Sequence, residues 1–147
     1  MLRFSFLGCL LMVCYACKAP SDLGKPSASA PKPDVQYYIW EKSQYRSVEQ
    51  LEQTPLDEQG KRTLLSKVQY PAVARENRIM GTVVGAVYLD EQGRIEKTEI
   101  IRNIGAKCGE EWTRVMTQYG PQVFKPAIYQ GKPVRSKIEI PITFRLG

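Results

Sequence analysis

The sequence offers few side chains that could carry out chemistry, and their types exclude most catalytic arrangements. It contains no histidine, which is the commonest general base and a frequent metal ligand. Glu110 and Glu111 are adjacent carboxylates, but no nucleophile or set of metal ligands stands near them. We therefore expect no enzyme activity, no catalytic residues, no metal site, no cofactor and no small-molecule substrate. Both carboxylates suit the first turn of a helix, where they interact favourably with its dipole.

Cys17 is the cysteine with the clearest chemical role. Residues 1–16 combine the positive charge of Arg3 with an apolar run that is too short to span a bilayer. This pattern predicts a lipoprotein signal peptide, with Cys17 carrying the lipid after cleavage. An ordinary cleaved signal peptide and an uncleaved N-terminal anchor remain as alternatives. Cys108 would then be the only other thiol, and we expect it to be buried, as free cysteines usually are.

The charge and composition of the chain say little about its partners. The net charge is +6, from 21 basic and 15 acidic residues that are spread along the sequence. Such a balance favours an anionic membrane surface or an acidic protein, and without a nucleic-acid motif it does not indicate DNA or RNA. Residues 17–34 are rich in Pro, Ser and Ala, which predicts a disordered or polyproline-like tether.

Residues 35–66 form a preamble that the sequence leaves poorly defined. Its first part, residues 35–40, is aromatic and β-branched, so it predicts either a strand or an arm that packs on the domain. The remainder is polar with scattered leucines, and we expect a short helix over residues 61–67.

Residues 67–147 carry the pattern of an α+β domain. Pro71 suits the first position of a helix and Gly81 suits its end, while Asp90–Gly93 reads as the turn of a hairpin. We predict two helices packed on one face of a small antiparallel three-stranded sheet. In the order α-β-β-α-β, the elements cover residues 72–80, 82–89, 94–102, 108–119 and 134–146.

The final strand shows the cleanest pattern in the chain. Its apolar residues alternate strictly with polar ones from Val134 to Leu146, as expected of a strand with one buried and one wet face. Pro141 lies inside this strand. Because proline cannot donate a ladder hydrogen bond, it belongs on an edge strand or at a bulge. The sequence therefore predicts that the last strand has an open edge.

The domain also resembles a known family, the C-terminal domain of TonB energy transducers. The resemblance covers roughly residues 67–147, and the joint order and spacing of its motifs are more specific than any motif alone. The matching motifs are Tyr70-Pro71-x-x-Ala74, Gly81-x-Val83, Asp90-x-x-Gly93-Arg94-Ile95, Gly105-x-x-Cys108-x-Glu110-Glu111, Phe124-Lys125-Pro126-Ala127, Gly131-Lys132-Pro133-Val134 and Ile140-Pro141-Ile142-x-Phe144.

The resemblance implies that the domain binds an extended peptide, the TonB box of an outer-membrane transporter, as an added strand beside the last strand. On that basis we expect a periplasm-facing protein in the cell envelope, anchored by its lipid, with a homodimer left open. The alternative is a structural or assembly lipoprotein that uses the same domain without a role in transport. The expected partner-binding edge consists of Arg135, Lys137, Glu139, Pro141, Thr143 and Arg145.

Overall fold

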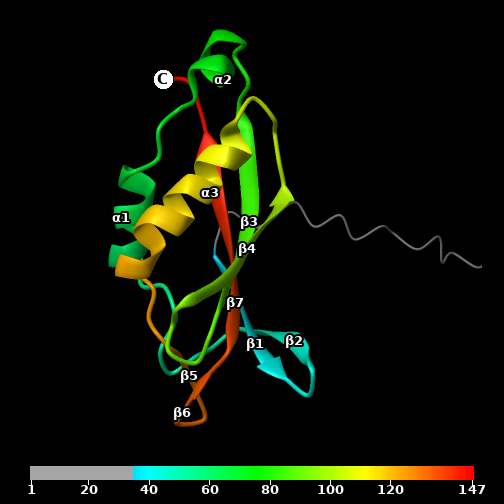
Figure 1. The fold of residues 1–147 in the computed structure, drawn as a ribbon, viewed down its shortest axis with the longest axis vertical. Helices are drawn as coiled ribbons and strands as arrows, with labels where there is room; N and C mark the ends of the chain where they lie inside the picture. Colours follow the sequence, from blue (N-terminus) through cyan, green and yellow to red (C-terminus); the bar gives the residue numbers. More distant parts are fainter. Residues whose placement is uncertain (1–34) are drawn as a thin grey trace, which may run out of the picture. The chain divides into compact units, whose positions relative to one another are not determined.

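The computed structural model describes residues 35–147, which lie within one compact unit (Figure 1). The predicted signal peptide, Cys17 and the tether over residues 17–34 lie outside the described residues. Within residues 35–147, no helix is long and apolar enough to cross a membrane.

The described chain alternates between strands and short helices. In chain order the elements are β1 (Gln36–Glu41), β2 (Gln44–Val48), α1 (Glu58–Ser66), α2 (Ala72–Glu76), β3 (Gly81–Leu89), β4 (Ile95–Arg102), α3 (Cys108–Tyr119), the 3-10 helix η1 (Gly120–Gln122), β5 (Ala127–Tyr129), β6 (Lys132–Val134) and β7 (Ser136–Phe144).

The main sheet has five antiparallel strands in the order β2-β1-β7-β3-β4, and β5 and β6 form a separate two-stranded ribbon. The expectation of a three-stranded sheet was therefore wrong, although the α+β class was right. The additional strands of the main sheet, β1 and β2, come from the preamble. Strand β1 joins the sheet because it buries Ile39 and packs Tyr37 against the core. Helix α1 comes from the preamble too, and its N-cap is Asp57, whose side chain accepts a hydrogen bond from the Gly60 N–H.

Helix α2 is shorter than the sequence indicated. It ends at Glu76, and Arg78 then adopts a left-handed backbone with φ of 53°. The chain folds back there, because the Ile79 N–H donates to Ala74 and the Tyr70 hydroxyl donates to the Ile79 carbonyl. Gly81 therefore opens β3 instead of ending the helix, and Pro71 is the N-cap and not the first helical residue.

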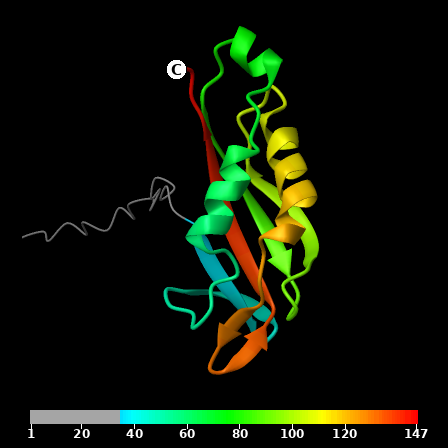
Figure 2. The same cartoon turned by 90° about the vertical axis from the view of Figure 1, so that its left-hand side faces the viewer.

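Helix α3 has the predicted bounds and supplies the centre of the core. It lies with α1 on one face of the main sheet (Figure 2), and its Trp112, Val115 and Met116 are fully buried. The Trp112 indole N–H donates to the Ile140 carbonyl of β7 at 2.9 Å. Its ring fills the space above Gly85, where an added Cβ would lie only 2.5 Å from the ring.

The final strand is interrupted at its start. Val134 belongs to β6, which pairs with β5, whereas β7 begins at Ser136. From Ser136 to Phe144 every second side chain is buried, as the alternation predicted. The two helices therefore cover the even-numbered side of β7 and leave its odd-numbered side facing outward.

Candidate functional site

The edge of β7 is partly covered, contrary to the expectation of an edge that is open throughout. Strand β3 pairs with β7 along its whole length, from Leu89 opposite Ser136 to Gly81 opposite Phe144. On the other side, β1 pairs only with Ser136–Glu139. Among residues 35–147, no strand pairs with that side of β7 from Ile140 onward. We call Ile140–Phe144 the open half of β7 and Ser136–Glu139 the covered half.

The direction of the ladder shows which backbone groups the open half presents. The Trp40 N–H of β1 donates to the Arg135 carbonyl at 2.9 Å. Because backbone groups alternate in direction along an antiparallel strand, the odd-numbered residues of β7 face the lane that β1 enters. In the open half these groups are the carbonyls of Pro141 and Thr143 and the N–H of Thr143. The backbone N–H that proline lacks would point toward the open side. Pro141 therefore removes no hydrogen bond from the ladder with β3.

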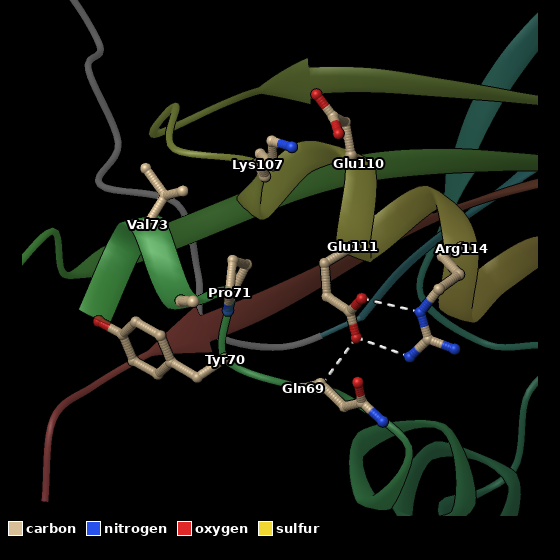
Figure 3. A pocket seen from close by; sticks show the side chains of 9 residues that line it. Gln69, Tyr70, Pro71, Val73, Lys107, Glu110, Glu111 and Arg114 are labelled. Atoms are coloured by element: carbon tan, nitrogen blue, oxygen red, sulfur yellow. Dashed lines mark hydrogen bonds and ion pairs between the residues drawn. The ribbon is translucent and has the colours of Figure 1, made fainter. Parts of the chain in front are cut away.

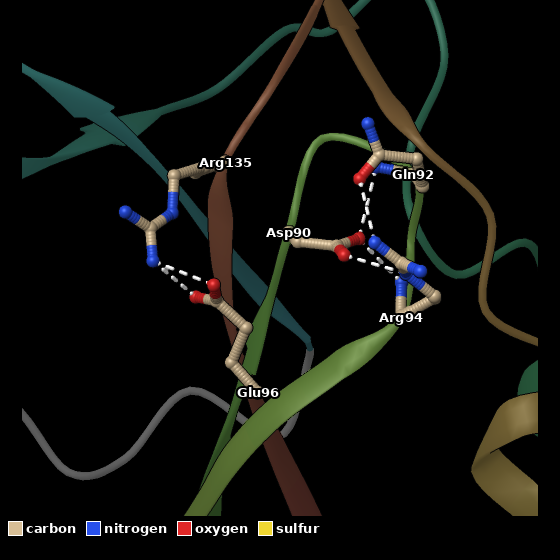
Figure 4. A network of polar contacts seen from close by, with 5 residues as sticks. All are labelled: Asp90, Gln92, Arg94, Glu96 and Arg135. Atoms are coloured by element: carbon tan, nitrogen blue, oxygen red, sulfur yellow. Dashed lines mark hydrogen bonds and ion pairs between the residues drawn. The ribbon is translucent and has the colours of Figure 1, made fainter.

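Three of the expected edge residues lie beside the covered half. Arg135 precedes β7 and forms an ion pair with Glu96 at 2.6 Å (Figure 4), which raises the pKa of its guanidinium. Lys137 and Glu139 pair with each other at 2.6 Å. Burial opposes the charge on Lys137 most strongly, but the hydrogen bond and the negative charge of Glu139, together with the nearby tyrosines, outweigh it, so the lysine pKa lies above its ordinary value. These three side chains are already neutralised by partners.

The other three expected residues lie at the open half. Pro141 is half-buried, and the Thr143 hydroxyl is 2.9 Å from the hydroxyl of Thr82 on β3. Arg145 lies just beyond β7, is exposed, and forms no ion pair within residues 35–147. Within the described part of the chain, the open half therefore combines unpaired backbone groups with the positive charge of Arg145, which no acidic side chain neutralises.

A shallow recess of about 290 Å³ adjoins the open half on the helix side. Its walls come from the end of α1, the segment after α1, and the last residues of the chain, namely Leu65, Val68, Tyr70, Ile142, Thr143, Phe144 and Arg145. Leu65 is 42% exposed although it is a large apolar residue. A strand that lay in the open lane would place every second side chain on this side of the sheet, so the recess suits an apolar side chain.

The recess wall is held in place by a clamp between α3 and the segment that follows α1 (Figure 3). Glu111 accepts a backbone hydrogen bond from Gln69 at 2.7 Å and pairs with Arg114. Arg114 also donates to the Lys67 carbonyl. Burial raises the pKa of Glu111, but the hydrogen bonds from Arg114 and Gln69 outweigh it, so the carboxyl pKa lies below its ordinary value. The Glu111 side chain thus positions the segment that follows α1.

The arrangement supports recognition by the backbone and offers no constellation for catalysis. Among the described residues, no group of His, Cys, Asp or Glu side chains could hold a metal ion. The sequence interpretation missed the recess altogether. Tyr70 carries a family motif, and its neighbourhood was a usable signal, but nothing in the sequence marked Leu65 or Val68 as lining a site.

Three comparisons relate this chain to known proteins. Residues 66–146 match the family model described as "Gram-negative bacterial TonB protein C-terminal". The chain is 33% identical over 78 residues to "Protein TonB" of Vibrio cholerae, a match that spans 53% of this chain and 31% of that protein. The solution structure of the Helicobacter pylori TonB-CTD has a TM-score of 0.50 and 19% identity, covering 60% of this chain and 79% of that one. The structural likeness supports the fold alone, and the chain spans about a third of the curated relative.

Proposed function

Because the chain belongs to the family of Gram-negative bacterial TonB C-terminal domains, we propose that it binds an extended segment of an envelope protein by strand addition. The added strand lies beside the open half of β7, and its backbone bonds with Thr143 and Pro141. Strand addition draws affinity from main-chain hydrogen bonds and specificity from pockets for alternate side chains. The TonB family is non-enzymatic, which agrees with a sequence that lacks histidine.

One observation carries this proposal: the side of β7 that faces away from β3 is unpaired from Ile140 to Phe144 within the described chain. A strand with free backbone groups on a sheet edge is a template for another extended chain. The recess lined by Leu65 and Tyr70 lies next to it, and Arg145 adds a positive charge that has no ion-pair partner within residues 35–147. The proposed segment therefore carries an apolar side chain toward the recess and a polar or acidic one near Arg145.

We propose that the partner is an outer-membrane transporter and that the bound segment is its TonB box, in TonB-dependent transport. The support for this partner is the family relationship and the match to the Vibrio cholerae protein. On this proposal the domain faces the periplasm. Cys17 carries a lipid that holds the chain at a membrane, and residues 17–34 form the spacer between the membrane and the domain. Labelling with a radioactive fatty acid tests the anchor: the wild type should incorporate the label and Cys17→Ala should not.

A nuclear magnetic resonance titration tests the binding proposal directly. The ¹⁵N-labelled protein is titrated with a panel of transporter-derived TonB-box peptides. We expect the largest amide shifts at Ile142, Thr143 and Phe144, with smaller shifts at Leu65 and Val68 across the recess. A matched peptide that is N-methylated at alternate residues cannot complete the ladder and should not bind. An amide signal of Thr143 that stays unchanged with every peptide would contradict strand addition at this edge.

Crosslinking in cells identifies the partner class. A photoreactive amino acid in place of Arg145, at the rim of the open half, should capture a transporter. Placed at Glu58, on the exposed start of α1, the same group should not. Capture of an assembly protein of the envelope in place of a transporter would favour the structural role over transport.

A further inference from the structure

The hairpin of β1 and β2 occupies the same lane that a partner strand needs. Strand β1 pairs antiparallel with Ser136–Glu139, so its N-terminal residue Gln36 lies opposite Glu139, next to the start of the open half. The hairpin ends at Val48, whereas the family match begins at residue 66. The covering hairpin is therefore an addition of this chain to the unit that the family model describes.

The hairpin is attached to the rest of the domain by side chains on both faces of the sheet. On the core side, Ile39 is 1% exposed and the Tyr37 hydroxyl donates to the Leu56 carbonyl at 2.9 Å. On the other side, the ring of Tyr45 from β2 packs edge-on against Trp40 and Tyr88, at centroid distances of 4.8 and 5.4 Å. We call these three rings the aromatic clasp.

The docked hairpin is not an ideal occupant of the covered half. Ser136 lies directly opposite Ile39 and is completely buried, yet its hydroxyl has no hydrogen-bond partner within the described residues. A buried hydroxyl without a partner destabilises the state that contains it. Trp40, at the other end of β1, stays 42% exposed. Both features leave room for a different strand to bind this half better.

We propose that the β1–β2 hairpin is an internal competitor for the β7 edge, and that a partner strand patterned like β1 displaces it. Such a partner would pair along all of β7 instead of the open half alone. It would place apolar side chains toward the core where β1 has Tyr37 and Ile39. It would also place an aromatic ring over Lys137, whose Nζ lies 4.8 Å from the ring centroid of Tyr38. This inference rests on the proposed function, because it concerns the same edge.

A labelled peptide copying Val35–Glu41 is the probe, because this sequence is already shown to pair with the covered half. Fluorescence anisotropy is measured on a full-length chain in which Cys9, Cys14 and Cys17 are serine. A second form adds Gln36→Cys and Glu139→Cys. These residues face each other across the β1–β7 ladder, where opposed Cα atoms lie about 5.5 Å apart, which a disulfide can bridge. Oxidation then locks the hairpin onto β7.

The peptide should bind the reduced form and bind the oxidised form at least about tenfold more weakly, because the lane is then permanently occupied. Tyr45→Ala removes both ring contacts of the clasp: the contact with Tyr88, which joins the hairpin to β3, and the contact with Trp40, which lies within the hairpin. Loss of the single contact with β3 should tighten binding about fivefold. Tyr45→Phe keeps the ring and should match the wild type. Equal binding to the oxidised and reduced forms, no effect of Tyr45→Ala, or no binding to any form would each overturn the competition.

Amide hydrogen exchange without any peptide provides a second measurement. Tyr45→Ala should accelerate exchange of the amides of Lys137 and Glu139, which face β1, and leave that of Ile138, which faces β3, unchanged. Exchange rates equal to those of the wild type would overturn the proposal.

The outcomes for the two proposals differ. If transporter peptides fail to bind while the β1 copy binds in a lock-dependent manner, the hairpin is displaceable and the proposed transporter partner is wrong. If transporter peptides bind equally well to the locked form, binding at the open half stands and the competition does not.

Discussion

Replacing Thr143 by proline removes the only N–H that the open half of β7 directs toward an incoming strand. The ladder direction set by the bond between Trp40 and Arg135 places the Thr143 N–H on the open side. The pairing of β7 with β3 therefore does not use this donor, and proline is tolerated on such an edge. Thr143→Pro should leave the fold intact and weaken the binding of a partner strand.

The size of the effect follows from one backbone hydrogen bond. The net contribution of such a bond is about 1 kcal/mol, and this corresponds to a roughly fivefold increase in Kd. The Thr143 side chain also contributes a hydrogen bond to Thr82, so Thr143→Ala is the matched control. Both variants lose the hydroxyl, and only the proline variant loses the N–H.

Isothermal titration calorimetry with the tightest peptide of the transporter panel measures the three affinities. Thermal unfolding followed by circular dichroism is recorded on the same samples to establish that each variant is folded. We expect the alanine variant to bind like the wild type and the proline variant to bind about fivefold more weakly. If a folded proline variant binds as tightly as the alanine variant, the backbone of Thr143 does not form the interface, and the reasoning from ladder direction is refuted.

Three further predictions concern the scaffold of the site. Gly85→Ala places a Cβ 2.5 Å from the Trp112 ring and should lower the free energy of unfolding by about 1–3 kcal/mol, measured by urea denaturation; an unchanged midpoint would show that the ring can move aside. The pKa of Glu111 lies below its ordinary value of 4.5, so the stability it contributes is present above that pH and lost as the pH falls through its lowered pKa. Glu111→Gln should therefore be less stable than the wild type at pH 7 but lose less stability between about pH 5 and pH 3, as seen in urea midpoints across that range. Burial raises the pKa of the Cys108 thiol, so in a chain lacking the other cysteines a thiol reagent at pH 8 should react only on unfolding; rapid labelling of the native protein would contradict the burial.

Several elements followed from local sequence pattern because local interactions decide them. Helix α3 runs from Cys108 to Tyr119 as its apolar spacing predicted, and Gly120-Pro121 ends it. The turn before β4 has Gly93 at φ of 79°, as a tight turn requires. The alternation of β7 correctly separated its buried from its outward residues. Helix α2 was overestimated, because the left-handed turn at Arg78 depends on hydrogen bonds that close only when the chain folds back.

The position of the candidate site was only partly accessible from sequence. Pro141 correctly marked a part of β7 that lacks a strand partner within residues 35–147 on one side. The same reasoning wrongly extended the open edge to Arg135, Lys137 and Glu139. Polar outward residues look alike whether the neighbouring lane is empty or occupied, so alternation alone cannot separate these cases.

By itself, the sequence determined the α+β class, the faces of β7, the absence of an imidazole and the family motifs. Only the tertiary structure decided that β1 joins the sheet, that it covers Ser136–Glu139, and that Leu65 and Tyr70 border the remaining lane. The physical reason is that strand pairing joins residues about a hundred positions apart, such as Gln36 and Glu139. Its register depends on which apolar side chains reach the core together. No local pattern in either segment contains that information.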